Sequence, residues 1–387
     1  MLDIAAHLQE WCADGRDFAV ATVMAVSGSA PRLPGAALAV DTDGTAVGSV
    51  SGGCVEGAVH ALCTEALRDG RTVTERFGYS DGEGLAVGLT CGGAIEVLVT
   101  PVRAGAPHRA VIAQALAAGA RRESAALVRA VAGPPELLGG ALLVRPDGST
   151  PRGAARSGSL GGPPELDRTA AAEARAMLEA GRTGTFEVGA EGSRCGEPVR
   201  LLVESSVEPP RMLVFGAVDF AAALVRTGRF LGHHVTVCDA RPVFATTERF
   251  PEAHEVVVGW PHDYLDRTAV DERTVVCVLT HDPKFDVPLL ERALRLPVAY
   301  VGAMGSRRTH ADRLARLREA GLTEAELARL HSPIGLDLGA RTPEEVALSI
   351  AAEVVASRRG GSGRPLTGGR MPLHHDGDAG GSSALPD

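Results

Sequence analysis

Short apolar runs alternate with helical patterns through the second half of the chain. Five of these runs have the β-branched, apolar character of buried strands, at 211–217, 233–240, 255–260, 274–280 and 297–303. Between them lie segments with apolar residues at helical spacing, such as 219–232. Strands that alternate with helices of this length are typical of βαβ units. We therefore predict an α/β fold here, a Rossmann-like domain with a doubly wound parallel sheet over residues 210–359.

The end of this domain carries the signals of a helix start. Thr342 suits the N-cap, Pro343 suits the first helical position, and Glu345 completes a capping box. From Gly360 onward the chain is rich in glycine and polar residues and shows no apolar period. Such a composition cannot bury a core, so residues 360–387 are predicted to form a disordered tail.

The first half of the chain contains a faint internal repeat. Three segments recur later in the same order: 37–49 resembles 141–153, 65–77 resembles 176–188, and 90–99 resembles 194–203. We predict a mixed α+β domain over residues 1–207, made of two β-rich copies at about 18–103 and 123–207, each with a crossover helix. Chance similarity in a chain rich in alanine and glycine is the alternative.

The two copies differ most in the segment before their helix. The first copy has SVSGGCVEGAVH (49–60) at this place, whereas the second has SGSLGGPPELD (157–167) and no cysteine. If both copies keep the fold and only one keeps Cys54, the fold alone does not require that thiol. We therefore expect the chemical site in the first copy.

The residues around Cys54 suit a site for an anionic ligand. Ser51, Gly52 and Gly53 precede a helix whose first turn holds Cys54 and Glu56. Glycines let the backbone come close to a ligand, and the N–H groups at a helix start attract anions. The same field favours the thiolate, the form of cysteine that acts as a nucleophile or metal ligand.

A second candidate, Cys91, is followed by Gly92 and Gly93 at the turn before a strand. Cysteines flanked by glycines lie open to a ligand more often than core cysteines do. The alternative for both Cys54 and Cys91 is the role of a small buried hydrophobic residue. Four other cysteines lie within helical or strand patterns and are expected to be packing residues: Cys12, Cys63, Cys238 and Cys277.

The predicted Rossmann domain departs from the dinucleotide-binding fingerprint. Of the three glycines in GxGxxG only Gly216 is present, because Val218 and Ala221 replace the others. Val218 takes the place of the glycine that lets the backbone approach a pyrophosphate. Asp239 does end the second strand, where an acid that binds ribose is expected. The pattern argues against NAD(P) binding of the usual kind, although Gly216 and Asp239 stay candidate ligand contacts.

Two further loops lie at strand ends, where open α/β sheets place their ligands. The loop 280–286 holds Lys284, the only lysine in a chain with 39 basic residues, which suggests a need for a compact ammonium. The loop 302–310 places Ser306 and Arg307 at a helix start, which suits a phosphate. A solvated basic turn is the alternative for the second loop.

Composition limits the classes of function. The net charge is -9, from 39 basic and 48 acidic residues, which argues against a general binder of nucleic acid or acidic membranes. No apolar stretch approaches the length of a membrane span, and the first residues lack the basic and apolar regions of a signal peptide. We therefore expect a cytoplasmic protein whose 7 cysteines are thiols.

Several of these motifs occur together in one known family. SVSGGCVEGAV and GLTCGG in the first half resemble the N-terminal domain of the xanthine dehydrogenase accessory (XdhC/CoxI-type) family. VTVCDAR, THDPKFD, YVGAMGSRR and the region from His331 to Glu353 resemble the Rossmann domain of the same family. The resemblance runs from about residue 10 to residue 360.

The resemblance implies a chaperone for molybdenum cofactor and argues against an enzyme. Members of this family bind the cofactor, a phosphorylated pterin dithiolene, while a cysteine desulfurase supplies its terminal sulfur. They then deliver it to the large subunit of a xanthine or carbon monoxide dehydrogenase. On this resemblance Cys54 and Cys91 face the molybdenum or its sulfur, and Glu56 binds the pterin or orients Cys54. Many proteins of this architecture pair, so a homodimer is also expected.

Two alternatives stay open at this point. One is an NAD(P)-dependent oxidoreductase in which Cys54 is a redox or nucleophilic residue, although the degenerate glycine pattern argues against it. The other is a pure protein-binding module for a client enzyme. The sequence does not identify the client, and it does not decide which domain holds the cofactor or whether the cofactor carries a nucleotide.

Overall fold

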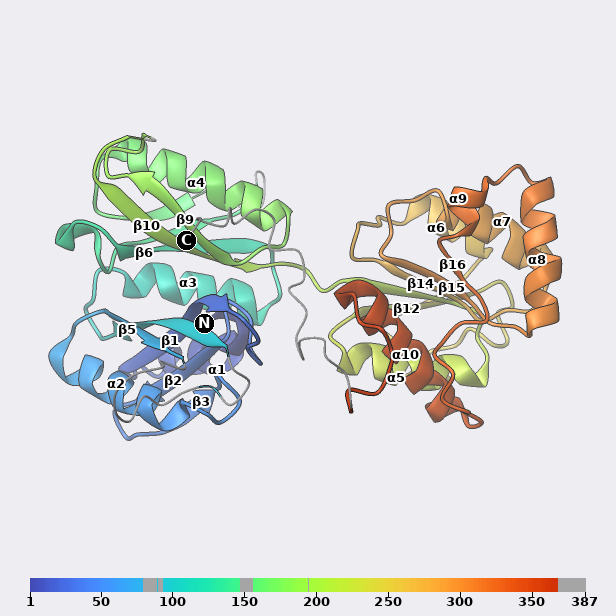
Figure 1. The fold of residues 1–387 in the computed structure, drawn as a ribbon, viewed down its shortest axis with the longest axis horizontal. Helices are drawn as coiled ribbons and strands as arrows, with labels where there is room; N and C mark the ends of the chain where they lie inside the picture. The colour runs from blue at the N-terminus through green and yellow to red at the C-terminus, as the bar shows by residue number, and fades with distance from the viewer. Residues whose placement is uncertain (79–88, 90–92, 147–155, 194, 368–387) are drawn as a thin grey trace. The chain divides into compact units, whose positions relative to one another are not determined.

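The computed structural model describes residues 1–78, 89, 93–146, 156–193 and 195–367. The chain forms two compact units, one from Met1 to Glu208 and one that begins at Pro209 (Figure 1). Each unit has hydrophobic cores of its own. None of the described helices is long and apolar enough to cross a membrane.

The first unit contains two five-stranded antiparallel sheets with the same strand order. The first sheet runs β3-β2-β1-β5-β4 and the second runs β8-β7-β6-β10-β9. The strands of the first sheet are β1 (Phe18–Ser27), β2 (Ala37–Asp41), β3 (Ala46–Gly48), β4 (Val73–Phe77) and β5 (Ala94–Val102). Those of the second are β6 (Ala125–Ala132), β7 (Ala141–Val144), β8 (Arg156–Ser159), β9 (Gly184–Gly189) and β10 (Pro198–Ser206). The two orders agree strand by strand, which confirms the internal duplication expected from the sequence.

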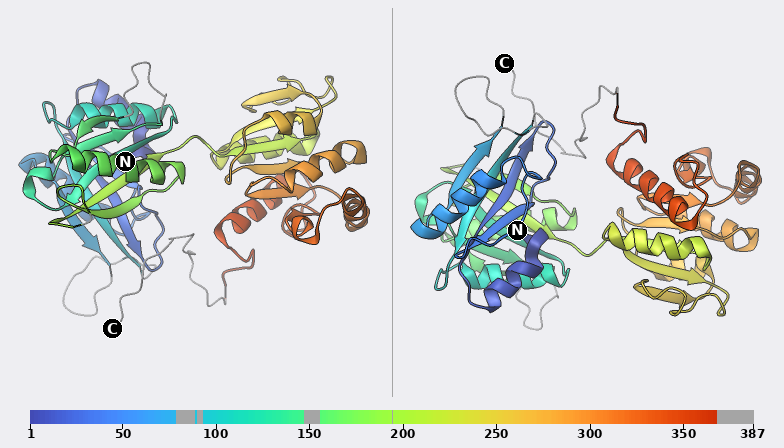
Figure 2. Two further views of the ribbon diagram at one scale, coloured as in Figure 1. Left: turned by 90° about the horizontal axis from the view of Figure 1, so that it is seen from above. Right: turned by 90° about the horizontal axis from the view of Figure 1, so that it is seen from below.

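Helices separate and cover the two sheets (Figures 1 and 2). In each copy one helix follows the third strand, α2 (Glu56–Asp69) in the first and α4 (Pro164–Glu179) in the second, and packs on the outer face of its sheet. Between the sheets lie α1 (Ala5–Ala13) and α3 (Arg109–Ala120), whose apolar residues meet both inner faces. The short helices η1 (Leu2–Ile4) and η2 (Pro135–Leu137) complete the unit.

The second unit is a parallel six-stranded sheet with helices on both faces. Its order is β13-β12-β11-β14-β15-β16, from β11 (Arg211–Phe215), β12 (His234–Asp239), β13 (Glu255–Val258), β14 (Val275–Val278), β15 (Tyr300–Ala303) and β16 (Leu330–His331). One face packs against α5 (Asp219–Phe230) and α10 (Pro343–Arg359). The other packs against α6 (Pro261–Arg267), α7 (Pro283–Ala293), α8 (Arg307–Glu319) and α9 (Glu324–Leu327). This is the predicted Rossmann-like sheet, and covered faces explain why its strands read as continuous apolar runs.

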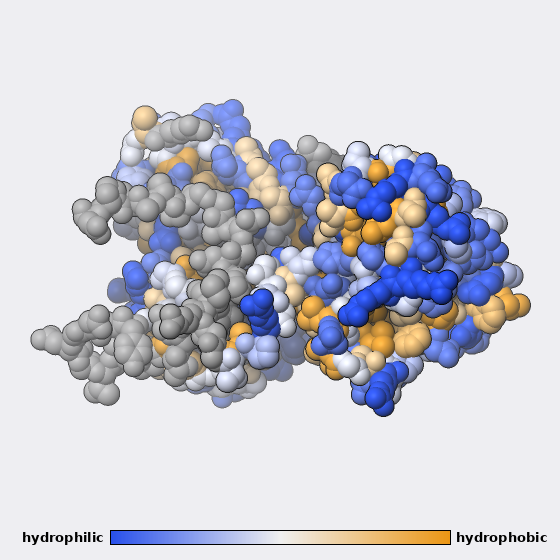
Figure 3. Space-filling view, turned by 45° about the vertical axis from the view of Figure 1, so that its right-hand side comes forward, coloured by the Kyte–Doolittle hydropathy of each residue, from blue (hydrophilic) through white to orange (hydrophobic). Residues whose placement is uncertain are grey.

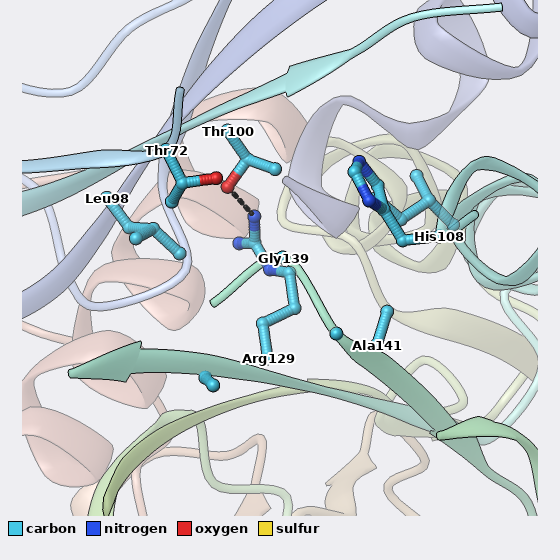
Figure 4. A pocket seen from close by; sticks show the side chains of 10 residues that line it. Thr72, Leu98, Thr100, His108, Arg129, Gly139 and Ala141 are labelled. Carbon is cyan, nitrogen blue, oxygen red and sulfur yellow. Dashed lines mark hydrogen bonds between the residues drawn. The ribbon is translucent and has the colours of Figure 1, made fainter. Parts of the chain in front are cut away.

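A buried charged cluster links the two sheets of the first unit. Arg129 on β6 donates to Thr100 on β5 at 3.0 Å, to Thr22 on β1 at 2.9 Å and to Glu204 on β10 at 2.6 Å. The α-amino group of Met1 also donates to Glu204. Arg129 lines a small pocket between the sheets, with Thr100 on the opposite wall (Figure 4). Residues of both copies therefore meet one guanidinium group.

Arg129→Met should destabilise the first unit by about 1–3 kcal/mol, because Glu204 keeps only the α-amino group of Met1 as a charged partner and the hydroxyl groups of Thr22 and Thr100 lose their donor. Arg200→Met is the matched control. Arg200 also bridges the sheets, to Glu96 at 2.9 Å, but both side chains are 30% exposed, so its loss should cost only about 0–1 kcal/mol. Urea unfolding followed by circular dichroism measures both losses. If both variants lost the same free energy of unfolding, the buried cluster around Arg129 would contribute no more than the exposed pair.

Candidate functional site

The loop between β3 and α2 has a backbone that only glycine adopts easily. Gly52 has φ +78° and Gly53 has φ +121°, both in the left-handed region. A Cβ atom added to either residue would meet no atom of the described residues within 4 Å. Backbone conformation therefore accounts for glycine at both positions.

The carboxylate of Glu56, the first residue of α2, holds this loop together. It accepts hydrogen bonds from the hydroxyl of Ser49 at 2.7 Å and from the backbone N–H groups of Ser51, Gly52 and Gly53 at 2.9, 3.0 and 2.8 Å. The hydroxyl of Ser51 also donates to Glu56, to Oε2, the oxygen that accepts the N–H of Gly53, whereas the other three groups donate to Oε1. The sequence analysis expected these backbone N–H groups to bind an anionic ligand. In the structure they donate to the carboxylate of Glu56.

These hydrogen bonds keep Glu56 ionised. Partial burial raises the pKa of Glu56, but the hydroxyl groups of Ser51 and Ser49 and the backbone N–H of Ser51 stabilise the carboxylate more strongly. The net effect lowers the pKa of Glu56 from 4.5 to about 2. A negative charge therefore stays at the start of α2 throughout the physiological pH range.

Cys54 is fixed to the same network through Ser51. The hydroxyl oxygen of Ser51 accepts the backbone N–H of Cys54 at 3.0 Å and that of Val55 at 3.1 Å. Val55 stands at the N-cap, where its side chain has no acceptor, so Ser51 takes over the capping role. Cys54 is half-buried and packs against a core cluster that includes Val50 and Leu89.

The second predicted cysteine motif is only partly visible. Cys91 and Gly92 lie outside the described residues. Leu89, two positions before Cys91, is buried in the same core cluster that Cys54 packs against. Gly93 is buried, and a Cβ atom there would lie 2.2 Å from the carbonyl oxygen of Ser29. Close packing against the chain after β1 therefore accounts for glycine at position 93.

The second copy lacks this arrangement. At the matching place Asp167 accepts one backbone hydrogen bond, from Leu160 at 2.9 Å, and Ser159 accepts one from Gly161 at 3.1 Å. Prolines occupy positions 163 and 164, where the first copy has its glycine and cysteine. The two copies thus share a fold, while the thiol beside a carboxylate-bound loop belongs to the first copy.

The acid at the end of β12 is engaged by its own neighbours. Asp239 accepts from the backbone N–H of Ala217 at 2.8 Å and from the guanidinium of Arg241 at 2.9 and 2.7 Å. Burial raises the pKa of Asp239, but Arg241 and the N–H of Ala217 outweigh it, so the pKa lies below its usual value. Gly216 packs closely against the loop that follows β14: a Cβ atom on Gly216 would lie 3.0 Å from the backbone nitrogen of Thr280. Both residues thus make structural contacts within the second unit.

The remaining predicted residues lie at two helix starts on the same edge of the sheet. Lys284 pairs with Asp282, the N-cap of α7, at 3.2 Å and is 61% exposed. Ser306 is the N-cap of α8 and accepts from Thr309 at 3.1 Å, and Arg307 follows it on the surface. The structure therefore uses Ser306 and Asp282 as helix caps.

A buried ion pair that the sequence analysis missed holds these two loops in place. Arg313 on α8 donates to Asp286 on α7 at 3.0 Å and to the carbonyl oxygen of Met304 at 2.8 Å. Thr280 donates to the other oxygen of Asp286. Arg313 and Leu317 are the buried residues of α8, one turn apart. That helical spacing was the available signal, since it places Arg313 on the core face.

The residues described do not form a metal centre by themselves. Among them no group of three or more histidine, cysteine, aspartate or glutamate side chains is arranged to hold a metal ion. The feature that remains is a partly exposed thiol on a rigid, glycine-rich loop beside a constant negative charge. Such a loop can present sulfur to a ligand that brings its own metal.

Glu56→Gln should destabilise the protein by about 1–3 kcal/mol at pH 7, because charged hydrogen bonds in the loop are lost. The pKa of Glu56 is lowered by folding, so its contribution is complete above about pH 4.5 and disappears as the pH falls towards 2. Urea unfolding of both proteins between pH 7 and pH 2 measures the difference. A gap between them that stays constant over this range would contradict the assignment.

Comparison with known families identifies both parts of the chain. A model described as the XdhC and CoxI family matches residues 11–78, and a model described as the XdhC Rossmann domain matches residues 212–354. A crystal structure described as a xanthine dehydrogenase from Bacillus halodurans has a TM-score of 0.63 at 23% identity, over 95% of this chain and 98% of that one. That likeness shows a common fold.

Three curated relatives extend the comparison. Uncharacterized protein YqeB of Escherichia coli (strain K12) is 29% identical over 244 residues, 60% of this chain, and the match spans only 43% of that protein. A protein of Bacillus subtilis (strain 168) named as a probable xanthine dehydrogenase component is 24% identical over 89% of this chain and 94% of its own length. Molybdenum cofactor insertion chaperone PaoD of Escherichia coli (strain K12) is 26% identical, over 89% and 84%. With both family models matched in order, the chain belongs to the XdhC and CoxI family.

Proposed function

We propose that this protein is an accessory factor that binds molybdenum cofactor, supports its sulfuration and delivers it to a xanthine or carbon monoxide dehydrogenase-type enzyme. Membership of the XdhC and CoxI family supports the proposal, as does the similarity to a relative named as a molybdenum cofactor insertion chaperone. The structural observation that carries it is the loop 49–56, where Glu56 fixes the backbone around the partly exposed Cys54.

The chemistry of this loop suits cargo that contains molybdenum and sulfur. A thiolate is a soft ligand, and soft metals prefer sulfur to oxygen or nitrogen. We assign Cys54 to the metal or its terminal sulfur and propose that Cys91 acts beside it. Gly52 and Gly53 are exposed and carry no side chain, which suits the approach of a ligand to the backbone beside the thiol. The predicted contacts at Gly216, Asp239, Lys284, Ser306 and Arg307 stay proposals of lower weight, because most of these groups already serve the fold.

The partners follow from this role. They are the large subunit of the recipient molybdoenzyme, a cysteine desulfurase, and a second copy of the chain. On the second unit, exposed apolar residues such as Phe230, Leu348 and Val355 are candidates for contact. Hydrophobic and hydrophilic areas alternate over the face seen in Figure 3, so that face does not single out one docking surface.

The alternative, an NAD(P)-dependent oxidoreductase, has weaker support in the second unit. Asp239 would bind ribose only after exchanging its hydrogen bonds to Arg241 and Ala217. Val218 also stands where a fingerprint glycine would allow a pyrophosphate to approach. Oxidation of NADH by the purified protein, with no molybdoenzyme present, would favour the oxidoreductase.

Cys54→Ser should lower the bound pterin and molybdenum at least about tenfold, since loss of a metal ligand costs no less than loss of a supporting group. The protein is purified from cells that make the cofactor. Pterin is then measured by fluorescence after oxidation and molybdenum by mass spectrometry.

Cys195→Ser is the matched control, because Cys195 is exposed in the second copy. It should leave both contents unchanged. If the wild type carries no pterin, or if Cys54→Ser keeps the wild-type amount, the proposed function is wrong.

A further inference from the structure

The carboxylate of Glu56 is connected to Cys54 by a short hydrogen-bonded path. Glu56 accepts the hydroxyl of Ser51, and the same hydroxyl oxygen accepts the backbone N–H of Cys54. Glu56 also holds the N–H groups of Gly52 and Gly53, the two residues directly before Cys54. Every residue from Ser51 to Cys54 is thus tied, directly or through one hydroxyl, to one carboxylate.

This path matters most for the two glycines, because their neighbours Ser51 and Val55 are buried and Cys54 packs against a core cluster. Gly52 and Gly53 are exposed, and no atom of the described residues lies within 4 Å of a Cβ position on either of them. Glycine also has more backbone freedom than any other residue. Without an acceptor at the centre, Gly52 and Gly53 would sample more conformations, and the backbone that leads into Cys54 would move with them.

We propose that Glu56 is a positioning residue that sets the place of the Cys54 thiol through Ser51. The inference rests on the proposed role of Cys54 in cargo binding, and it assigns Glu56 to the protein and not to the pterin. Because its oxygens are occupied by loop donors, Glu56 acts on cargo through Cys54 and not by contact.

Removal of the carboxylate leaves a defined gap. In Glu56→Ala the hydroxyl of Ser49 and the N–H groups of Ser51, Gly52 and Gly53 lose a common acceptor, at a place open to solvent. N–H groups that converge in this way bind small anions. Acetate carries the same carboxylate, so it should refill the gap and restore the loop.

The experiment measures the reaction of Cys54 with iodoacetamide at pH 7 by peptide mass spectrometry. In Glu56→Ala the alkylation rate of Cys54 should rise by about fivefold, because losing the carboxylate lets the loop open locally more often and expose the thiol. Acetate should bring the rate back towards the wild type, whereas chloride at the same ionic strength should not. Glu56→Asp, which keeps the charge, should lie between the two.

Two controls separate positioning from general loosening. Cys195 is exposed in the second copy, so its rate should not change in any variant. Glu65→Ala alters an exposed carboxylate on the same helix, with a side chain that is 61% exposed, and should leave Cys54 unchanged. A Cys54 rate within twofold of the wild type in folded Glu56→Ala, or an equal rise at Cys195, would overturn the proposal.

Ser51→Ala tests the path even if Glu56→Ala does not fold. It removes the hydroxyl that joins the carboxylate to the N–H groups of Cys54 and Val55, so the Cys54 rate should rise and acetate should not restore it. An unchanged rate would show that Ser51 does not transmit the restraint, and would overturn the proposed path.

Cofactor content, measured on the same proteins, distinguishes the two proposals. Pterin in the wild type that falls in Glu56→Ala supports both. If the wild type holds no pterin but the alkylation results stand, the cargo assignment fails and the positioning role remains. If Glu56→Ala keeps all of its pterin, Glu56 does not position Cys54 for cargo.

Discussion

A guanidinium group buried between two sheets has to find all its partners there, and this constraint fixes the first unit. Arg129 reaches Thr22 and Thr100 in one copy and Glu204 in the other. A small slide of one sheet over the other would break at least one of these contacts and leave a buried polar group without a partner, which is costly. Apolar contacts such as those of Met24 and Leu202 tolerate such a slide better, because they are not directional. The polar cluster therefore selects one stacking of the two copies.

Glycine positions show which parts of the two copies are structurally equivalent and which differ. Gly48 and Gly158 hold equivalent positions, and a Cβ atom on them would lie 2.2 and 2.3 Å from the carbonyl oxygens of Ala37 and Ala141. Both copies thus need glycine here for the same steric reason. Gly52 has no such neighbour. Its glycine serves the turn around Glu56, a feature of the first copy, so divergence between the copies is concentrated in the loop before the helix.

The sequence predicts patterns that depend on near neighbours, and it does so well here. Apolar runs predicted the parallel sheet, and the Thr342 capping box is present with both of its hydrogen bonds. The internal repeat could be detected because three similar segments recur in the same order along the chain. Contacts between distant segments were not readable: the pairing of Arg313 with Asp286 depends on how α7 and α8 pack. For Glu56 two roles stayed open, contact with the pterin or orientation of Cys54, since a carboxylate at a helix start suits either.

In both units a carboxylate of the chain itself accepts backbone N–H groups near a helix start. Backbone N–H groups near a helix start attract anions, and Glu56 and Asp239 supply these anions at α2 and ahead of α5. A phosphate that arrives at either place has to displace a carboxylate already held by several hydrogen bonds. Charge alone therefore gives the cargo little advantage at these loops. A thiolate is a softer ligand than the carboxylate and hydroxyl groups around it. Under the proposed function, selectivity for a metal and sulfur cargo therefore has to come from Cys54, and the carboxylate of Glu56 serves to hold that sulfur in place.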